Sequence, residues 1–472
     1  MSENEGARPL TVKDVTITRY DVTKRAVAAA ALGNMTEWYD FGVYSYLAPT
    51  VSLVFFSDLP PSLGIVAALG TFAASFLVRP LGGLFFGPLG DRIGRTRVLS
   101  FTLILMALGT GLIGVVPSYE SIGIAAPLLV LFGRLVQGFS TGGEYAGAMT
   151  FIAEYAPDRR RGFLGSWLEF GTLTGYAFGA LLVTCLTFLL DRSQMLSWGW
   201  RIPFLLALPL GVIGLYLRLR LEETPAFERL RASSRERRGL PTRTELRLIF
   251  TTHWRAVLMV GGLVIVWNVT NYMLTSYMPT YLTSTLPAHG ESRTSTTTSQ
   301  ALQVVVLLLL MVIVTFLGRL SDRVGRRPIL LAGSVGLIVL SLPAVLLLRV
   351  GGLVPTFGGL LVIALLLVCF SSTLPSTLPA MFPTEIRYGG LAITFNIFVS
   401  AFGGTTAVVT SALVLATGDL NWPGYYLMAA GIIGAVSALL IPETAGRPLS
   451  GSMPAVTTEA EARDIVRAHE ER

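Results

Sequence analysis

The sequence predicts an all-α integral membrane protein of twelve transmembrane helices arranged in two six-helix halves. Three observations support this fold class: the composition, the spacing of long apolar runs and an internal repeat. Of the 472 residues, 52% are hydrophobic and only 14% are charged, and the mean hydropathy is +0.63. A soluble domain has about 25% charged residues. Most of the chain is therefore expected to lie in lipid.

The apolar runs are long enough to cross a bilayer. A helix needs about 20 residues to span the roughly 30 Å hydrocarbon core. The predicted spans are 27–55, 62–86, 98–116, 122–153, 163–190, 200–218, 254–282, 299–317, 328–349, 354–381, 390–416 and 423–441. An even number of spans places both termini on the same side of the membrane.

Basic residues lie at alternate connections between these spans. The connections rich in arginine are 92–97, 159–161, 229–243 and 323–327, whereas 57–61 and 117–121 contain no Lys or Arg. Cytoplasmic loops carry such an excess of basic residues. We therefore expect a multi-pass protein of the cell membrane with both termini cytoplasmic. The net charge of +7 follows from this pattern, and no nucleic-acid partner is predicted.

The chain contains an internal duplication. The turn Gly87–Arg95 recurs as Gly318–Arg326, and Pro157–Arg161 is matched by Pro383–Arg387 at the same spacing. Repeated sets of membrane helices are typical of secondary transporters. The predicted parts are a cytoplasmic N-terminal segment 1–26, a first bundle 27–218, a cytoplasmic linker 219–253, a second bundle 254–442 and a short cytoplasmic tail 443–472. The end of the tail predicts a surface helix, because it is too short for a coiled coil.

These motifs resemble those of a known family. The repeated Gly-x-x-x-Asp-Arg-x-Gly-Arg turn, together with Arg134–Gly138, resembles the signatures of the major facilitator superfamily, and Gln137–Tyr145 is similar to its metabolite:proton symporter branch. Within that branch, further runs resemble the proline/glycine betaine transporters. These runs are Glu37–Tyr44, Trp198–Pro203, Leu221–Phe227, Asn268–Leu274 and Thr377–Thr384.

The resemblance implies the major facilitator fold and a monomeric unit that imports a small zwitterionic solute, such as proline or glycine betaine, together with a proton. One alternative is a proton symporter for a carboxylic metabolite such as citrate, 2-oxoglutarate or shikimate. A dicarboxylate calls for a second buried cation besides Arg134, and Arg79 is expected near the surface. Further alternatives are a drug:proton antiporter, disfavoured because span 163–190 lacks a Gly-Pro pair, and a membrane sensor.

No motif for an enzyme or for a nucleotide-driven pump is present. The sequence lacks a Gly-x-x-x-x-Gly-Lys loop, a catalytic Ser/His/Asp arrangement and metal-ligand spacings. We expect no cofactor and no metal, with the proton gradient as the driving force and the lipid bilayer as the surroundings.

The proton carrier is predicted to be a carboxylate, because no histidine lies at membrane depth. Glu37 and Asp40 are three residues apart and share one helix face. Two close carboxylates in a low dielectric would not both be ionised. Alternatively, either one forms a permanent pair with an arginine or lies in water. Glu144 and Glu169 are further candidates for proton relay.

Arg134 is the predicted fixed positive charge, with Gln137 one turn along the same face. It would bind a substrate carboxylate or a deprotonated Glu, or act as a structural ion pair between spans. Other predicted site residues are Tyr44, Trp267, Asn268, Asn271, Ser376 and Asn396. A betaine needs aromatic faces around its quaternary ammonium. The available aromatic residues are Trp38, Tyr39, Tyr44, Trp267 and Tyr272.

The repeated turn is predicted to act as a gate. The resemblance implies that it latches one half against the other on the cytoplasmic side, and Arg79 is a further candidate for that latch. Glu154, beside Pro157 and Arg161, is expected in a cytoplasmic charge lock. The gate residues are Gly87, Asp91, Arg92, Gly94, Arg95, Gly318, Asp322, Arg323, Gly325 and Arg326.

Overall fold

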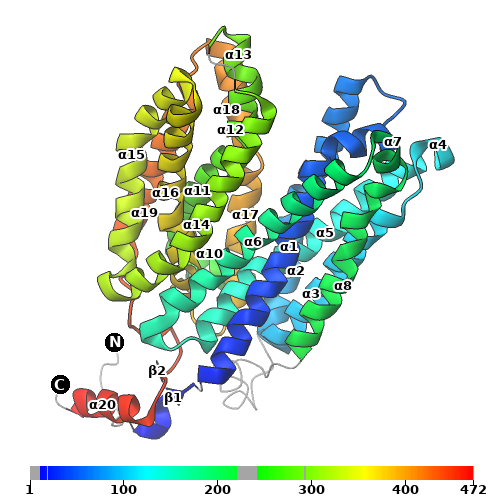
Figure 1. The fold of residues 1–472 in the computed structure, drawn as a ribbon. Helices are drawn as coiled ribbons and strands as arrows, with labels where there is room; N and C mark the ends of the chain where they lie inside the picture. The colour runs from blue at the N-terminus through cyan, green and yellow to red at the C-terminus, as the bar shows by residue number, and fades with distance from the viewer. Residues whose placement is uncertain (1–10, 19, 220–241, 292–293, 471–472) are drawn as a thin grey trace.

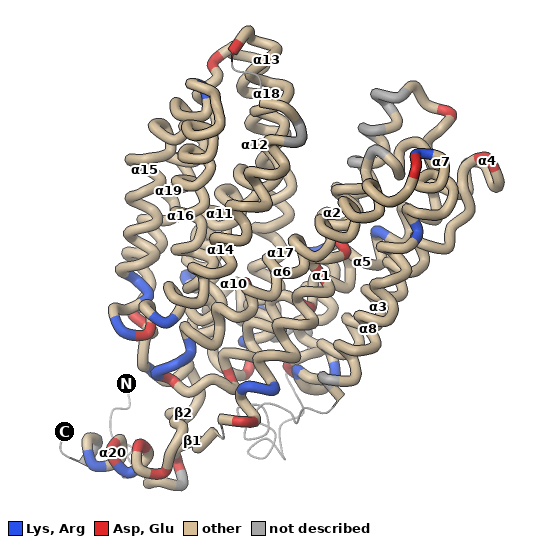
Figure 2. The backbone as a smooth tube through the Cα atoms, viewed as in Figure 1, with Lys and Arg blue, Asp and Glu red and all other residues tan. Residues whose placement is uncertain are grey.

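The computed structural model describes residues 11–18, 20–219, 242–291 and 294–470. These residues form two helical bundles that meet at the end carrying both chain termini and diverge toward the opposite end (Figure 1). We call the end with the termini the terminal side. Charged residues gather there and are sparse along the middle of the helices (Figure 2).

The first half contains six long helices. They are α1 (Tyr20–Phe55), α2 (Pro61–Ile93), α3 (Arg95–Val115), α5 (Ala125–Tyr155), α6 (Arg161–Leu189) and α8 (Arg201–Leu219). Four short helical turns connect them. These are α4 (Tyr119–Ile122), η2 (Asp158–Arg160), α7 (Arg192–Gln194) and η3 (Met195–Gly199).

The second half repeats this arrangement after α10 (Thr242–Thr251). Three of its spans are interrupted by short 3-10 or π segments. The first consists of α11 (Trp254–Tyr272), η4 (Met273–Tyr277), α12 (Met278–Thr280), η5 (Tyr281–Thr285) and α13 (Leu286–Ala288). The second consists of α16 (Leu353–Thr377) and η6 (Leu378–Met381), and the third of α17 (Arg387–Phe398), η7 (Val399–Gly403) and α18 (Thr406–Thr417). The other three are α14 (Thr296–Val324), α15 (Arg326–Val350) and α19 (Trp422–Leu440).

Each predicted span coincides with one of these twelve helical segments of the described chain, to within a few residues at most ends. Ten of the segments are long and apolar enough to cross a membrane by length and composition. The other two, α1 and α5, have the length but carry more polar and charged residues. Most of the linker, and the predicted Leu221–Phe227 motif, lie outside the described residues.

Glycines let α2 and α5 approach closely. A Cβ atom at Gly138 would lie 2.1 Å from the carbonyl oxygen of Ser75, and one at Gly142 would lie 2.3 Å from that of Arg79. Only glycine fits at these positions, as is typical of packed membrane helices. The backbones of α2 and α5 therefore touch near the arginines that each helix carries.

A small module joins the two chain ends. Strand β1 (Thr16–Ile17) pairs in parallel with β2 (Ala455–Val456), and η1 (Val12–Asp14) and α20 (Glu459–Glu470) flank the pair (Figure 1). Helix α20 is the surface helix that the tail sequence predicts. Its apolar side covers the pair through a small cluster that contains Val15, Val456 and Ala462.

Candidate functional site

A buried ion pair links the first two helices. Glu37 of α1 accepts a hydrogen bond from Nη2 of Arg79 of α2 at 3.2 Å, and both side chains are almost fully buried. The Arg79 guanidinium also lies 5.0 Å from the ring centre of Phe41 and 4.8 Å from that of Phe76. The prediction that Arg79 lies near the surface, in the latch, is therefore wrong. The partner of Glu37 that the structure shows is therefore Arg79.

A second polar network surrounds Asp40. Its Oδ2 accepts a hydrogen bond from the Thr110 hydroxyl, which is also bonded to the side-chain amide of Gln137. Arg134 donates from Nη1 to Oε1 of Gln137 at 2.9 Å and lies 3.5 Å from the ring centre of Tyr44. Among the described residues, Oδ1 of Asp40 and two Arg134 nitrogens have no hydrogen-bond partner.

Two networks therefore hold the two carboxylates of α1, although their spacing placed both on one helix face. The structure brings together Asp40, a candidate for proton coupling, and Tyr44, Arg134 and Gln137, three candidates for the substrate or charge site. Sequence reasoning missed Thr110, because a single threonine in an apolar run carries no signal of its own.

An aromatic cluster fills the junction between the halves. Tyr145 of α5 lies 5.7 Å from Trp267 of α11 and 5.0 Å from Phe395 of α17, both in stacked geometry, and Trp38 meets Tyr145 edge-on at 6.3 Å. Trp38 also contacts Tyr176 at 5.3 Å. These rings come from five helices of the two halves, so their arrangement depends on how the halves meet.

Glu169 of α6 joins this cluster to the second half. Its carboxylate accepts a hydrogen bond from the Tyr145 hydroxyl, and it lines one small cavity together with Ser371 of α16. The indole nitrogen of Trp267 donates to the same serine at 2.9 Å. A buried carboxylate, which was only a further candidate from the sequence, therefore sits where both halves contribute polar groups.

A small enclosed cavity of about 10 Å³ lies beside Glu169. That volume is close to what one water needs. Its polar and aromatic lining residues are Trp38, Glu169, Thr172, Tyr176, Trp267, Asn271, Thr275 and Ser371. Asn268 does not share this cavity; it bonds to the carbonyl of Val264 and faces Gly403. The polar stripe predicted along α11 therefore divides between two faces.

Other predicted site residues lie elsewhere. The carbonyl of Ser376 accepts a hydrogen bond from Arg326 at 3.3 Å, which places it beside the repeated turn. Asn396 donates to the carbonyl of Gly142 at 2.6 Å and so bridges α17 and α5. Glu144 is fully buried on α5. None of these three residues lines the cavity.

The Glu37–Arg79 pair borders the same aromatic cluster, because Glu37 precedes Trp38 on α1 and the Arg79 guanidinium lies over Phe76, whose ring centre is 5.8 Å from that of Tyr272. The Tyr272 hydroxyl has no hydrogen-bond partner among the described residues. By contrast, Tyr39 bonds to the carbonyl of Pro203 at 2.7 Å. Aromatic faces and charges of both signs therefore surround one central region.

Each repeated turn binds the start of a helix in the opposite half. The Asp91 carboxylate accepts hydrogen bonds from the backbone N–H groups of Tyr388 at 3.3 Å and Gly389 at 2.6 Å, in the first turn of α17. In the repeat, Asp322 accepts from Gly162 at 2.7 Å and Phe163 at 2.8 Å, in the first turn of α6. A carboxylate at a helix N-terminus is favourable, since the unpaired N–H groups and the helix dipole both attract it.

Salt bridges reinforce the two turns. Arg95 lies 3.0 Å from Asp91, and Arg326 lies 3.5 Å from Asp322. Glu154 bridges the halves in the first network, with its oxygens 2.7 Å from Arg387 and 3.5 Å from Arg95.

The glycines of the repeated turns meet geometric demands. Gly94 and Gly325 join consecutive helices at φ values of 109° and 104°, which side chains rarely adopt. A Cβ atom at Gly87 would come within 2.9 Å of the Gly389 backbone, and one at Gly318 within 2.4 Å of Ser166. Arg92 and Arg323 of the same turns are exposed. The repeated turns therefore need glycine wherever the two halves touch.

Comparison with known proteins identifies the family. The model of the sugar (and other) transporter family matches residues 26–240 and 231–453. The proline/betaine transporter of Escherichia coli strain K12 is 45% identical over 99% of this chain and 93% of its own length. The glycine betaine/proline/ectoine/pipecolic acid transporter OusA of Dickeya dadantii is 45% identical over 98% and 92%.

This chain belongs to the sugar (and other) transporter family of the major facilitator superfamily. The proton:xylose symporter XylE has the same fold, with a TM-score of 0.72 and 19% identity over 91% of this chain and 98% of its own. Family membership and this likeness confirm the predicted fold class and a multi-pass membrane protein.

Proposed function

We propose that this transporter is a proton-coupled symporter that imports a small zwitterion, such as proline or glycine betaine, by alternating access. The names of its relatives support this substrate class. We place it in the cell membrane with the terminal side cytoplasmic, because basic residues concentrate there (Figure 2). One chain provides the whole central region, so we take the transport unit to be a monomer.

The observation that carries the proposal is the aromatic cluster with Glu169 at its edge. A quaternary ammonium cannot donate a hydrogen bond, so it is recognised by aromatic faces and a carboxylate. Trp38, Tyr145, Tyr176 and Trp267 supply the faces, and Glu169 supplies the negative charge. The carboxylate of the solute would then face Arg79, on the Glu37 side of the same cluster.

The Asp40 network is the proposed proton site. Asp40 is buried without a direct salt bridge, and one of its oxygens has no hydrogen-bond partner among the described residues. Arg134 cannot release its own proton and so acts as a fixed positive charge near it. A proton on Asp40 would change the bonds through Thr110 and Gln137 to Arg134. Glu37, Glu144 and Glu169 remain further candidates.

The structure corresponds to a state closed on the terminal side. Both repeated turns bond across the halves there, whereas the bundles diverge at the other end (Figure 1). Transport requires a second state in which these bonds are broken and the terminal side is open. The proton and the solute would bias the equilibrium between the two states.

A second candidate function is symport of a carboxylic metabolite. One observation favours it, because Arg79 provides the second buried cation that the sequence did not predict. Its charge is already offset by Glu37 at 3.2 Å. Arg79 can therefore offer only part of its charge to a substrate, which suits the single carboxylate of a zwitterion better than citrate.

Uptake assays in membrane vesicles test both functions. We expect labelled proline or glycine betaine to accumulate and a protonophore to abolish accumulation. Uptake of citrate without betaine would favour the second function, and insensitivity to the protonophore would contradict proton coupling.

Two variants separate the roles within the site. Glu169→Gln should raise the KM for glycine betaine at least tenfold, because a charge facing the ammonium is lost. Asp40→Asn should abolish accumulation while solute exchange across the membrane continues, because exchange needs no net proton movement. Glu291→Gln, which changes a half-buried ion pair with Arg349 away from the proposed site, is the control. An Asp40→Asn variant that accumulates solute normally would remove Asp40 from the mechanism.

A further inference from the structure

The chain segment that follows the last helix crosses the terminal side of the second half. We call residues 443–456 the strap. Arg326 donates from Nη1 to the carbonyl of Thr444 at 3.1 Å, and Arg387 donates from Nη2 to the carbonyl of Ser450 at 2.5 Å. Both arginines are buried and belong to the gate region, so the strap is bonded to the gate in its own half.

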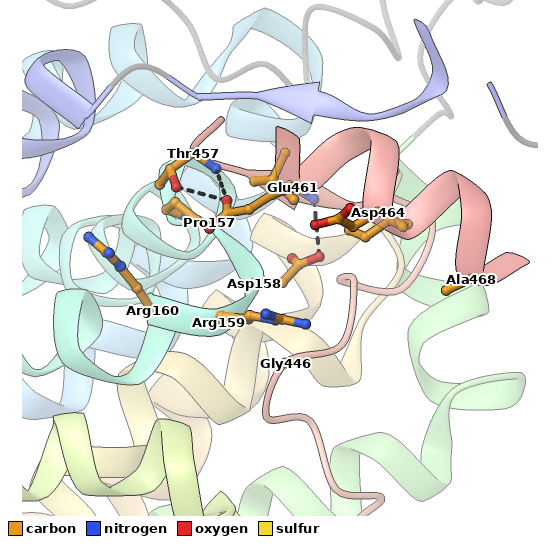
Figure 3. Close-up of a pocket in the computed structure, with 12 residues that line it drawn as sticks. Pro157, Asp158, Arg159, Arg160, Gly446, Thr457, Glu461, Asp464 and Ala468 are labelled. Atoms are coloured by element: carbon orange, nitrogen blue, oxygen red, sulfur yellow. Dashed lines mark hydrogen bonds between the residues drawn. The ribbon is translucent and has the colours of Figure 1, made fainter. Parts of the chain in front are cut away.

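The same strap is bonded to the first half. Arg161 donates from Nη1 to the carbonyl of Arg447 at 2.9 Å, and the N–H of Ala455 donates to Oδ2 of Asp158 at 3.0 Å. Figure 3 shows Asp158 directed toward the tail. Asp158 and Arg161 are both buried. Because the strap continues from α19, each of these bonds connects the two halves.

The strand pair adds a third connection between the halves. The N–H of Thr16 donates to the carbonyl of Pro454, and that of Thr18 donates to the carbonyl of Val456, each at 2.8 Å. Strand β1 immediately precedes α1 of the first half, whereas β2 is the end of the strap. The N-terminal segment and the tail are therefore held together across the gate.

We propose that the strap is an intramolecular lock: it docks on the gate of both halves, holds the terminal side closed, and must be released before that side opens. Separation of the halves would stretch the bonds of the strap to Asp158, Arg161 and β1. The proposal rests on the proposed function only in that the halves alternate between two states.

The surroundings of the strap favour its release from the gate. Helix α20 does not pack tightly on the gate turn η2, because a cavity of about 340 Å³ lies between them (Figure 3). Arg159, Arg160, Glu461 and Asp464 are among its lining residues. The apolar cluster of the module connects the strap to the end of η1 and to α20 rather than to the helices of the bundle. Apart from the buried side chain of Leu449, few apolar contacts of the strap therefore oppose its detachment from the gate.

A reversible disulfide across the strand pair tests the lock. The strand register places Ile17 opposite Val456, a geometry within reach of a disulfide. The native cysteines Cys185 and Cys369 would first be replaced by serine, and uptake by that background confirmed. In Ile17→Cys with Val456→Cys, we expect oxidation to lower solute uptake at least tenfold and a reductant to restore it. Ile17→Cys alone is the control for oxidation.

A second experiment measures the conformation without transport. Ala455→Pro removes the donor to Asp158 but keeps the strand acceptors at Pro454 and Val456. Spin labels at the exposed positions Arg97 and Glu385 report the distance between the halves on the terminal side. We expect Ala455→Pro to enlarge the population with the longer distance. Met453→Pro is the matched control, since no hydrogen bond is found for that N–H within the described chain.

The outcomes separate the lock from the proposed function. Complete cross-linking with unchanged uptake would overturn the lock, as would an unchanged distance distribution in Ala455→Pro. A protein that takes up neither proline nor betaine in either redox state would overturn the substrate assignment. The spin-label distances would then still decide whether the strap holds the gate.

Discussion

The gate has two copies, each formed by one repeated turn and the helix start that it binds. The two copies have the same backbone arrangement but are stabilised by different side chains. In each copy an aspartate of the repeated turn binds a helix start in the other half, at Asp91 and Asp322. In the first copy the nearby arginines meet on one buried carboxylate, Glu154. In the second copy Arg161 and Arg326 instead donate to backbone carbonyls of the strap.

The repeat explains how this difference arose. Pro157 aligns with Pro383, so the position equivalent to Glu154 is Ala380. Without a carboxylate there, Arg161 reaches Asp158 and the carbonyl of Arg447. The first copy therefore has a buried carboxylate of its own, although Arg387 also donates to the carbonyl of Ser450, whereas the second copy has none at the equivalent position and relies on the strap. Duplication therefore preserved the geometry of the gate, but the second copy relies on the strap for hydrogen-bond acceptors.

Glu154→Ala should produce the largest effect. It leaves Arg95 and Arg387 in a buried site without the anion that lies between them, and loss of one partner from a buried ion pair costs about 3–5 kcal/mol. We expect a much lower thermal unfolding midpoint in detergent and a shift of the gate toward the open state. A midpoint unchanged from that of the native protein would contradict the central role of Glu154.

Asp158→Ala should cost less, about 1–3 kcal/mol, the range for leaving hydrogen-bonding groups unpaired. The carbonyl of Arg447 still accepts from Arg161, so the arginine keeps a partner. The same thermal measurement, made alongside Glu154→Ala, compares the two copies directly. Equal losses in the two variants would mean that the strap contributes nothing to the second copy.

The fold was predictable because it depends on local signals. Long apolar runs and alternating basic connections specify the spans, and the repeat shows that the halves correspond. Even α1 and α5, which contain more polar residues than the other spans, are predictable from the length of their apolar runs and from the connections on either side of them.

The site was only partly predictable. Which side chains on different helices become partners depends on how closely the helix backbones approach each other. The pairing of Glu37 with Arg79 follows from the crossing of α1, α2 and α5, which no spacing along one helix reveals. Tyr145 lay within a motif that was recognised, but its stacking between Trp267 and Phe395 requires both halves in contact. The bonds of the strap had no sequence signal, because they use backbone carbonyls that any residue provides.

The smallest effect on the unfolding midpoint is expected from removing the charge of Glu443 in the strap, and this effect should depend on pH. Burial alone raises the pKa of Glu443, but hydrogen bonds from the backbone N–H groups of Arg326, Ala445, Arg327 and Thr444 lower it more, so the net pKa lies below the ordinary value of 4.5. The contacts with Arg326 and Arg327 measure 3.0 and 3.1 Å.

A carboxylate whose pKa is lowered on folding stabilises the native state fully above its unfolded pKa, and this contribution is lost as pH falls through the lowered value. Glu443→Gln should therefore lower the unfolding midpoint by a constant amount from pH 7 to about 5. The difference from the native protein should shrink below about pH 4.5. A difference that grew on acidification would mean that protonated Glu443 is the form that holds the start of α15, and that the strap is anchored there by something other than charge.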